Sequence, residues 1–334
     1  MKLELHEHPA LFAQLQAEWN DLLKRSPADS IFSTWEWQST WWDAYQPGQL
    51  WVVTCRDENG QLVGIAPCFI DPEGVVRGIG CEDVTDYIDF IVDGAYLDTV
   101  YNELAAYFAS CRSQFKAIEI CNIPQESPTY QHFPHILEEH QFSASTEQQE
   151  VVPLIELPAD WEGFLNLLDK KQRHEVRRKM RKIGTVDIDW YQVGPEHHLE
   201  EELQKFLKLM AASDAEKRAF LENPAHVTFF KRFVEIAHEK GWLWLCFLNI
   251  NGEAVAAYLN FDYNNQVLVY NSGQLHGQHD SLSPGIVLLA YTIRAAIERG
   301  YAVFNFLRGD EVYKYRMGAH DTHIYKLSAH LNQN

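Results

Sequence analysis

The chain has 334 residues, of which 46% are hydrophobic and 22% are charged, and its formal net charge is −19. This composition excludes a disordered or fibrous protein, and the length predicts about two folded domains. The negative charge argues against a protein that scans DNA or coats an anionic membrane, because both functions need a broad positive field.

The six cysteines show no C-x-x-C or other regular spacing, which predicts reduced thiols and neither a zinc site nor a disulfide framework. The first residues, MKLELHEHPALFAQLQAEW, contain no uninterrupted apolar stretch of the kind found in signal peptides. No window approaches the ~20 apolar residues that cross a bilayer. We therefore expect a cytoplasmic protein without membrane insertion.

The first half of the chain alternates helical and strand patterns. Two β-rich runs meet at Asn59-Gly60, a strong signal for a hairpin turn. The tryptophans of the aromatic stretch over 31–45 are spaced as a buried helix face, which is favoured over a ligand-stacking role. The other expected elements are helices over 10–24, 97–113 and 134–140 and strands over 75–80, 87–92, 116–123 and 151–157.

The second half repeats this order, and two further β-rich runs meet at Asn251-Gly252. Because hairpin, strand, helix and strand occur twice in one chain, we predict two copies of one α/β unit. We place the domains at 1–155 and 156–334. The expected elements of the second half are helices over 161–182, 196–240 and 284–299 and strands over 242–261, 266–273 and 302–307.

The segment LDKKQRHEVRRKMRKIG, residues 168–184, concentrates basic residues in an acidic chain. At helical spacing Val176, Met180 and Ile183 form one apolar stripe. The opposite side is basic, which fits either a solvated face or a site for phosphate or another polyanion.

A second candidate is the helix start in GQLHGQHDSLSPGIVLL, residues 273–289. Ser283 is placed to cap this helix, Pro284 lies in its first turn and Gly285 allows close approach of a ligand. Free N–H groups at such a start bind pyrophosphate, although an ordinary capped helix has the same pattern.

Charged residues also gather where two strands end. After the expected strand at 302–307, a glycine turn carries carboxylates that could act as a general base and a lysine that could stabilise an oxyanion, although a salt-bridged turn would look the same. In the first half, CEDVTDYIDF could orient a polar or cationic acceptor or form a structural turn. The residues concerned are Arg308, Asp310, Glu311, Tyr313, Lys314 and Arg316 in the second half and Asp83, Asp86, Tyr87 and Asp89 in the first.

Several familiar signatures are missing from the chain, namely a G-x-S-x-G elbow, a Walker-type loop and an H-E-x-x-H helix. His276, His279, His320 and His323 have neither helical i, i+4 pairing nor a defined acidic partner, so we expect no metal.

Four segments in order resemble the GNAT-like acyltransferases of the tandem-domain, FemAB-related type, and most closely the group labelled CelD/BcsL-like acetyltransferases. IFSTWEWQSTWWDAY resembles that group's early tryptophan segment, and IGCEDVTDYIDFIV its D-Y-x-D strand. KKQRHEVRRKMRKI resembles its basic helix, and SPGIVLLAYTIRAAIERGYAVFNFLRGDEVYKYRMG its closing block. Together they span about residues 31–318.

The resemblance implies an α/β (α+β) protein of two tandem GNAT-like domains, each a mixed, mostly antiparallel sheet flanked by helices, sharing a cleft. It implies acyl transfer from acetyl-CoA or another acyl-CoA, or from aminoacyl-tRNA in the Fem branch, to a polar acceptor. Carried over by position, Ser283, Pro284 and Gly285, with Gln274, would bind the donor. The other implied site residues are Asp310, Tyr313 and Lys314 near the acyl centre and Asp86, Tyr87, Arg173, Arg177 and Arg178 for the acceptor.

Two positions depart from the family pattern. The R/Q-x-x-G-x-G/A loop of simple GNAT enzymes is not intact in GQLHGQHDSLSPG, and Asn305 stands where an acidic residue is more usual. Three alternatives follow: an acyl-CoA-dependent transferase, a Fem-type transferase that uses aminoacyl-tRNA, and a non-catalytic ligand-binding descendant.

Overall fold

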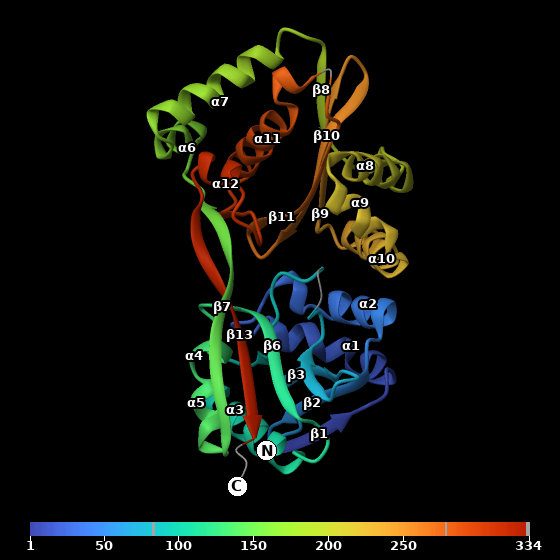
Figure 1. The fold of residues 1–334 in the computed structure, drawn as a ribbon, viewed down its shortest axis with the longest axis vertical. Helices are drawn as coiled ribbons and strands as arrows, with labels where there is room; N and C mark the ends of the chain where they lie inside the picture. Colours follow the sequence, from blue (N-terminus) through green and yellow to red (C-terminus); the bar gives the residue numbers. More distant parts are fainter. Residues whose placement is uncertain (82–83, 278, 332–334) are drawn as a thin grey trace. The chain divides into compact units, whose positions relative to one another are not determined.

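The computed structural model describes residues 1–81, 84–277 and 279–331, which form two compact units (Figure 1). The first unit consists of Met1–Val151 and of the chain from His323 onward, and the second of Val152–Thr322. No helix within the described ranges is both long and apolar enough to cross a membrane.

The first unit is a mixed sheet with helices on both faces. Its strands are ordered β1 (Lys2–His6), β2 (Gln49–Arg56), β3 (Leu62–Ile70), β4 (Val75–Gly78), β6 (Ala117–Pro124) and β13 (His320–Leu331), and β5 (Ile91–Val92) pairs with β3. One face is covered by α1 (Ala10–Leu23) and α2 (Trp35–Tyr45), and the other by α3 (Leu97–Ser110), α4 (Pro128–Gln131) and α5 (Phe133–Glu139) (Figure 1). As the aromatic spacing predicted, Trp37 and Trp41 are fully buried.

The second unit has the same layered build. Its strands are ordered β7 (Phe142–Glu156, which enters this unit at Val152), β12 (Val303–Asn305), β11 (Gln266–Gln274), β10 (Glu253–Tyr263), β9 (Leu243–Ile250) and β8 (Ile188–Gln192). One face carries α8 (Leu199–Ser213), α9 (Ala215–Glu222) and α10 (Pro224–Glu239), and the other α6 (Trp161–Leu167), α7 (Lys170–Ile183), α11 (Pro284–Glu298) and the short α12 (Val312–Arg316) (Figure 1).

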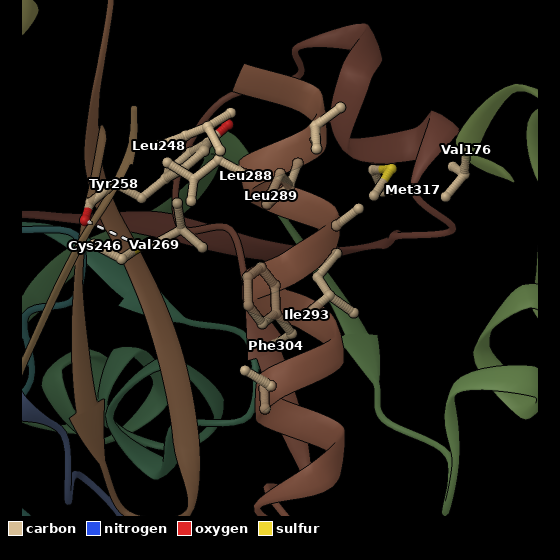
Figure 2. Close-up of a cluster of buried hydrophobic side chains, with 14 of the residues drawn as sticks. Val176, Cys246, Leu248, Tyr258, Val269, Leu288, Leu289, Ile293, Phe304 and Met317 are labelled. Carbon is tan, nitrogen blue, oxygen red and sulfur yellow. Dashed lines mark hydrogen bonds between the residues drawn. The ribbon is translucent and has the colours of Figure 1, made fainter. Parts of the chain in front are cut away.

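The core of the second unit lies between its sheet and α11 (Figure 2). Cys246, Leu248, Tyr258 and Val269 extend from the sheet toward Leu288, Leu289 and Ile293 of α11, and Val176 of α7 packs at the outer side near Met317. On the opposite face Gly273 lets α8 approach β11, because a Cβ at that position would lie 2.6 Å from the backbone nitrogen of Met210.

Strand pairing confirms the predicted repeat. In the first unit β3 is antiparallel to β4, which is parallel to β6 after the crossover through α3. In the second unit β10 is antiparallel to β11, which is parallel to β12 after the crossover through α11. At the hairpin between β9 and β10, Asn251 and Gly252 adopt φ angles of 53° and 80°, the left-handed region that this turn needs. The fold is therefore the mixed, mostly antiparallel α/β arrangement that the sequence predicted.

Four elements differ from the expected ones. The helix expected over 161–182 is two helices, α6 and α7, because Asp169 caps a new helix start by accepting from Gln172 N. The described residues after His323 lie in the first unit, because β13 pairs antiparallel with β6, whereas we had placed this segment in the second domain. The helical segment over 196–240 is three helices, because Asp214 and Asn223 cap new helix starts by accepting from Lys217 N and Ala225 N. The strand expected over 87–92 is reduced to β5.

The prediction that all cysteines are reduced thiols is wrong for one pair. Cys81, which follows β4, and Cys121, on β6, form a disulfide across 40 residues of sequence. Spacing could not indicate this pair, because the two residues meet only through the parallel pairing of β4 with β6. Cys55, Cys68, Cys111 and Cys246 are free.

Thiol counting tests the disulfide directly. We expect about four thiols to react with Ellman's reagent when the protein is unfolded without reductant, and about six after reduction. Replacing Cys81 with serine should expose the thiol of Cys121, whereas replacing Cys111 with serine should remove one. Six reactive thiols in the unreduced protein would contradict the pairing.

Candidate functional site

The candidate active site of the second unit is a gap between two parallel strands. β11 and β12 pair only over Gln266–Leu268 and Val303–Asn305, and β11 then continues to Gln274 without β12 as its neighbour. The chain leaves β12 through a turn in which Leu307 has a φ of 57° and Gly309 a φ of 107°. The Asn305 side chain stabilises this turn, because its Oδ1 accepts from Leu307 N at 2.9 Å.

Lys314 holds this turn from the inside. Its side chain is 2% exposed, and Nζ donates to the carbonyl oxygens of Leu307, Arg308 and Gly309 at 3.2, 2.6 and 3.0 Å. Nζ also pairs with Glu311 Oε2 at 2.9 Å. The hydrogens of the ammonium group are therefore used by the turn after β12. Lys314 affects the site by fixing the position of that turn.

Tyr313 and Asp310 lie on the same short segment as Lys314 but in different environments. Asp310 is exposed. Tyr313 is half-buried, and its ring meets the Phe306 ring edge-on with centroids 6.2 Å apart. Burial, reinforced by the charge of Glu311, raises the pKa of the Tyr313 hydroxyl above its usual value, so this group is a neutral proton donor at pH 7.

The start of α11 lies beside the end of β11. Pro284 is the first helical residue and Ser283 the N-cap, but Ser283 has a φ of 53° and its side chain makes no capping hydrogen bond. The Gln274 side chain fills the space beside Gly285 that a Cβ would need. The structure thus brings Gln274 to the Ser283-Pro284-Gly285 start, where helix N–H groups without intrahelical acceptors could bind an anion.

Sequence reasoning missed Lys217, Ser272 and Tyr258. Lys217 of α9 is half-buried, and its Nζ donates to Ser272 O at 2.6 Å and to Ser272 Oγ at 3.0 Å. Tyr258 of β10 is opposite Ser272 in the strand register. No local signal pointed to this group, because Lys217 and Ser272 are 55 residues apart in sequence.

The basic segment forms the expected amphipathic helix, α7. Asp169 caps it by accepting from Gln172 N at 2.8 Å, and Val176 and Ile183 are buried. Lys182 Nζ donates to Ser281 O at 2.7 Å, which ties α7 to the loop before α11. The basic side borders a hollow of about 720 Å³ lined by Lys170, Lys171, Arg173, His174, Glu175, Arg177 and Arg181.

The three arginines proposed for a substrate have different partners. Arg177 pairs with Glu162 at 2.7 Å and Arg178 with Glu175 at 2.8 Å, and both arginines are exposed. Arg173 is half-buried and donates from Nη2 to Leu168 O at 3.1 Å, while its buried Nε has no hydrogen-bond partner. Arg173 thus differs from the other two arginines in having no carboxylate partner among these contacts.

In the first unit, chain segments fill the corresponding gap. β4 and β6 pair over Val75–Arg77 and Ala117–Glu119, and beyond this point Ile88 N donates to Asn122 O at 3.1 Å. Asn122 Nδ2 donates to Thr85 O at 2.8 Å. Between these contacts Asp86 is buried and Tyr87 half-buried, with the Tyr87 ring edge-on to Phe32 at 5.7 Å. Asp83 lies outside the described residues.

The described residues contain no group of three or more histidine, cysteine or acidic side chains that could hold a metal ion.

Two layered α/β units in one chain, each with a parallel strand pair joined through a helix, are the arrangement to which the comparisons also point. Residues 170–315, most of the second unit, match the family described as "Acetyltransferase (GNAT) domain". Among curated proteins, none matches the sequence.

Solved structures resemble the whole chain. The crystal structure of FemX superimposes with a TM-score of 0.66 at 13% identity, covering 98% of this chain and 97% of that chain. L-PGS from Bacillus licheniformis gives 0.58 at 10% identity, with 95% and 92% covered. The tandem GNAT protein from the clavulanic acid biosynthesis pathway gives 0.50 at 11% identity, with both chains fully covered. At these identities the likeness concerns the fold.

Proposed function

We propose that this protein is an acyltransferase, and in the first instance an N-acetyltransferase, that transfers an acyl group from an acyl-CoA to an amine or hydroxyl. The acceptor is a polar small molecule or a precursor of cell-envelope or other polysaccharide, in keeping with the CelD/BcsL-like motifs. One observation carries this proposal: β11 and β12 stop pairing after Leu268 and Asn305, within the segment that matches a GNAT domain. The donor carries an acyl group other than an aminoacyl group, and the reaction takes place in the cytoplasm.

The reaction that we propose is direct attack of the acceptor on the thioester. The acceptor nitrogen or oxygen bonds to the thioester carbon, the carbon–sulfur bond breaks, and the acceptor proton passes to Asp310 directly or through water. The proton that Asp310 accepts, or one from water, neutralises the leaving thiolate, and the neutral Tyr313 hydroxyl donates a hydrogen bond to its sulfur. Lys314 is a positioning residue in this scheme, since its Nζ holds the turn that carries both groups. Ser283, Pro284, Gly285 and Gln274 receive the donor pyrophosphate.

For the acceptor we propose a phosphate-bearing molecule at α7. Arg173, Arg177 and Arg178 supply the positive charge, and Arg173 and Arg177 line the hollow beside this helix. Asp86 and Tyr87 of the first unit remain proposed acceptor-binding residues.

A Fem-type transferase that takes its group from aminoacyl-tRNA is the second candidate. The basic side of α7 favours it. A non-catalytic descendant is the third candidate, and the structural role of Asn305 in the turn supports it.

Ligand-induced stabilisation and thiol release separate these candidates. We expect millimolar acetyl-CoA to raise the thermal midpoint, because a ligand at a hundred times its Kd adds about 2.7 kcal/mol of stability. We expect free CoA thiol to appear once an acceptor panel that includes phosphorylated amino sugars is added. No stabilisation by acetyl-CoA would contradict the proposal, and stabilisation without transfer to any acceptor would favour the non-catalytic alternative.

The tRNA alternative makes a different prediction. It requires binding of aminoacyl-tRNA that weakens steeply with salt and weakens further when Arg177 and Arg178 are both replaced with alanine. Replacing Arg294, an exposed arginine of α11 that pairs with Glu298, is the matched control. Binding that does not depend on salt, or that the Arg294 variant reduces equally, would remove this alternative.

A further inference from the structure

We propose that Lys217 and Ser272 form a binding site for an oxyanion, either a carboxylate or a phosphate, carried by a molecule that enters the gap beside β11. The proposal deepens the proposed transferase function by naming a chemical group of one substrate. Binding of the oxyanion can nevertheless be measured without any transfer reaction.

The geometry places an ammonium group at the unpaired part of β11. Lys217 Nζ lies 2.6 Å from Ser272 O and 3.0 Å from Ser272 Oγ. Ser272 comes after Leu268, the last residue of β11 that pairs with β12. An ammonium group has three hydrogens, and Ser272 accepts two of them, so one remains for a ligand.

No fixed anion neutralises this ammonium group. Within the described ranges Lys217 forms no ion pair, although Asp214 and Glu311 lie near enough to favour its charged form. Both carboxylates already have partners, since Asp214 accepts from Lys217 N at the start of α9 and Glu311 pairs with Lys314. Burial lowers the pKa of Lys217, and the charges of Asp214 and Glu311 offset this only in part.

The neighbouring groups add donors. Tyr258, opposite Ser272 in the register, is 6% exposed, and its hydroxyl makes no hydrogen bond to any described residue. Burial raises the Tyr258 pKa well above its usual value, so this hydroxyl stays protonated. Lys217 and Ser272 therefore offer polar hydrogens at one point of the strand, and the Tyr258 side chain lies on the same face of the sheet as that of Ser272, which suits an oxyanion better than a cation.

The rival explanation is that Lys217 only pins the edge of β11. If Lys217 only stabilises the strand edge, its amine would be modified at the same rate with and without small anions. If Lys217 binds an oxyanion, small anions would slow the modification. Reductive methylation with isotopic formaldehyde, read at each lysine by peptide mass spectrometry, distinguishes the two. The probes are inorganic phosphate, acetate and chloride at constant ionic strength, and the internal control is Lys208, an exposed lysine of the adjacent α8.

We expect phosphate or acetate to slow modification of Lys217 at least tenfold and to leave Lys208 unchanged. Protection by phosphate alone assigns a phosphate-bearing substrate, and protection by acetate alone a carboxylate. The same anion should raise the thermal midpoint of wild type and Lys208→Met but not of Lys217→Met. Equal labelling of Lys217 in phosphate, acetate and chloride would overturn the proposal, and labelling of the wild type needs no variant to fold.

The outcome is separable from that of the proposed function. Anion protection of Lys217 without acyl transfer would support the oxyanion site and contradict the proposed transferase function. Release of CoA thiol without anion protection would support the transferase function and contradict the oxyanion site.

Discussion

Replacing Lys314 with methionine is expected to lower the free energy of unfolding of the second unit by about 3 kcal/mol or more, and to abolish transfer activity. Methionine keeps the length of the side chain but leaves the carbonyls of Leu307, Arg308 and Gly309 without the donor that they share. Each buried acceptor left unsatisfied costs roughly 1–3 kcal/mol. The Glu311 side chain is 55% exposed, so solvent weakens its ion pair with Lys314. The loss of the carbonyl contacts therefore accounts for most of the destabilisation.

Urea denaturation followed by tryptophan fluorescence measures this change. The matched control is Arg294→Met, which removes the exposed pair with Glu298 in the same unit and should cost no more than about 0.5 kcal/mol. A Lys314→Met protein as stable as the Arg294→Met protein would show that the turn does not depend on Lys314.

Replacing Asp89 with asparagine is expected to remove the loss of stability that ionisation of Asp89 causes in the first unit as the pH rises. Asp89 is 7% exposed, and burial raises its pKa from 3.8 to about 6, although hydrogen bonds from Ser127, Thr129 and Phe90 N oppose the shift. The folded state holds the Asp89 proton more tightly than the unfolded chain does. The contribution of Asp89 to the free energy of unfolding is therefore greatest below pH 3.8 and falls as the pH rises toward 6. A shift of about two units corresponds to about 3 kcal/mol.

Asparagine cannot titrate, so the variant should gain stability relative to wild type as the pH rises from 4 to 7. Asp71→Asn provides a control of opposite sign. Burial opposes ionisation of Asp71, but bonds from Val75 N and Arg77 outweigh it and lower the Asp71 pKa. Its contribution is present at neutral pH and is lost as the pH falls through that lowered pKa, so the Asp71→Asn deficit should shrink in acid. A constant difference between Asp89→Asn and wild type at every pH would contradict the assignment.

Elements set by neighbouring residues were predictable from the sequence. The Asn251-Gly252 turn needs two left-handed residues in succession, and α7 shows its buried Val176 and Ile183 at helical spacing. The repeated order of hairpin, strand, helix and strand predicted two related units because parallel strands need a crossover helix. The basic side of α7 could also be predicted from the sequence, although its contacts with Glu162 and Ser281 could not.

Contacts between distant segments were decided only by the tertiary structure. Pairing of β13 with β6 returns the described C-terminal residues to the first unit, and the Cys81–Cys121 disulfide depends on the pairing of β4 with β6. The role of Lys314 as an internal support and the contact of Lys217 with Ser272 likewise arise from folding. The physical reason is range: turns and helix faces depend on residues a few positions apart, whereas strand order and buried polar contacts depend on which distant segments the packed core brings together.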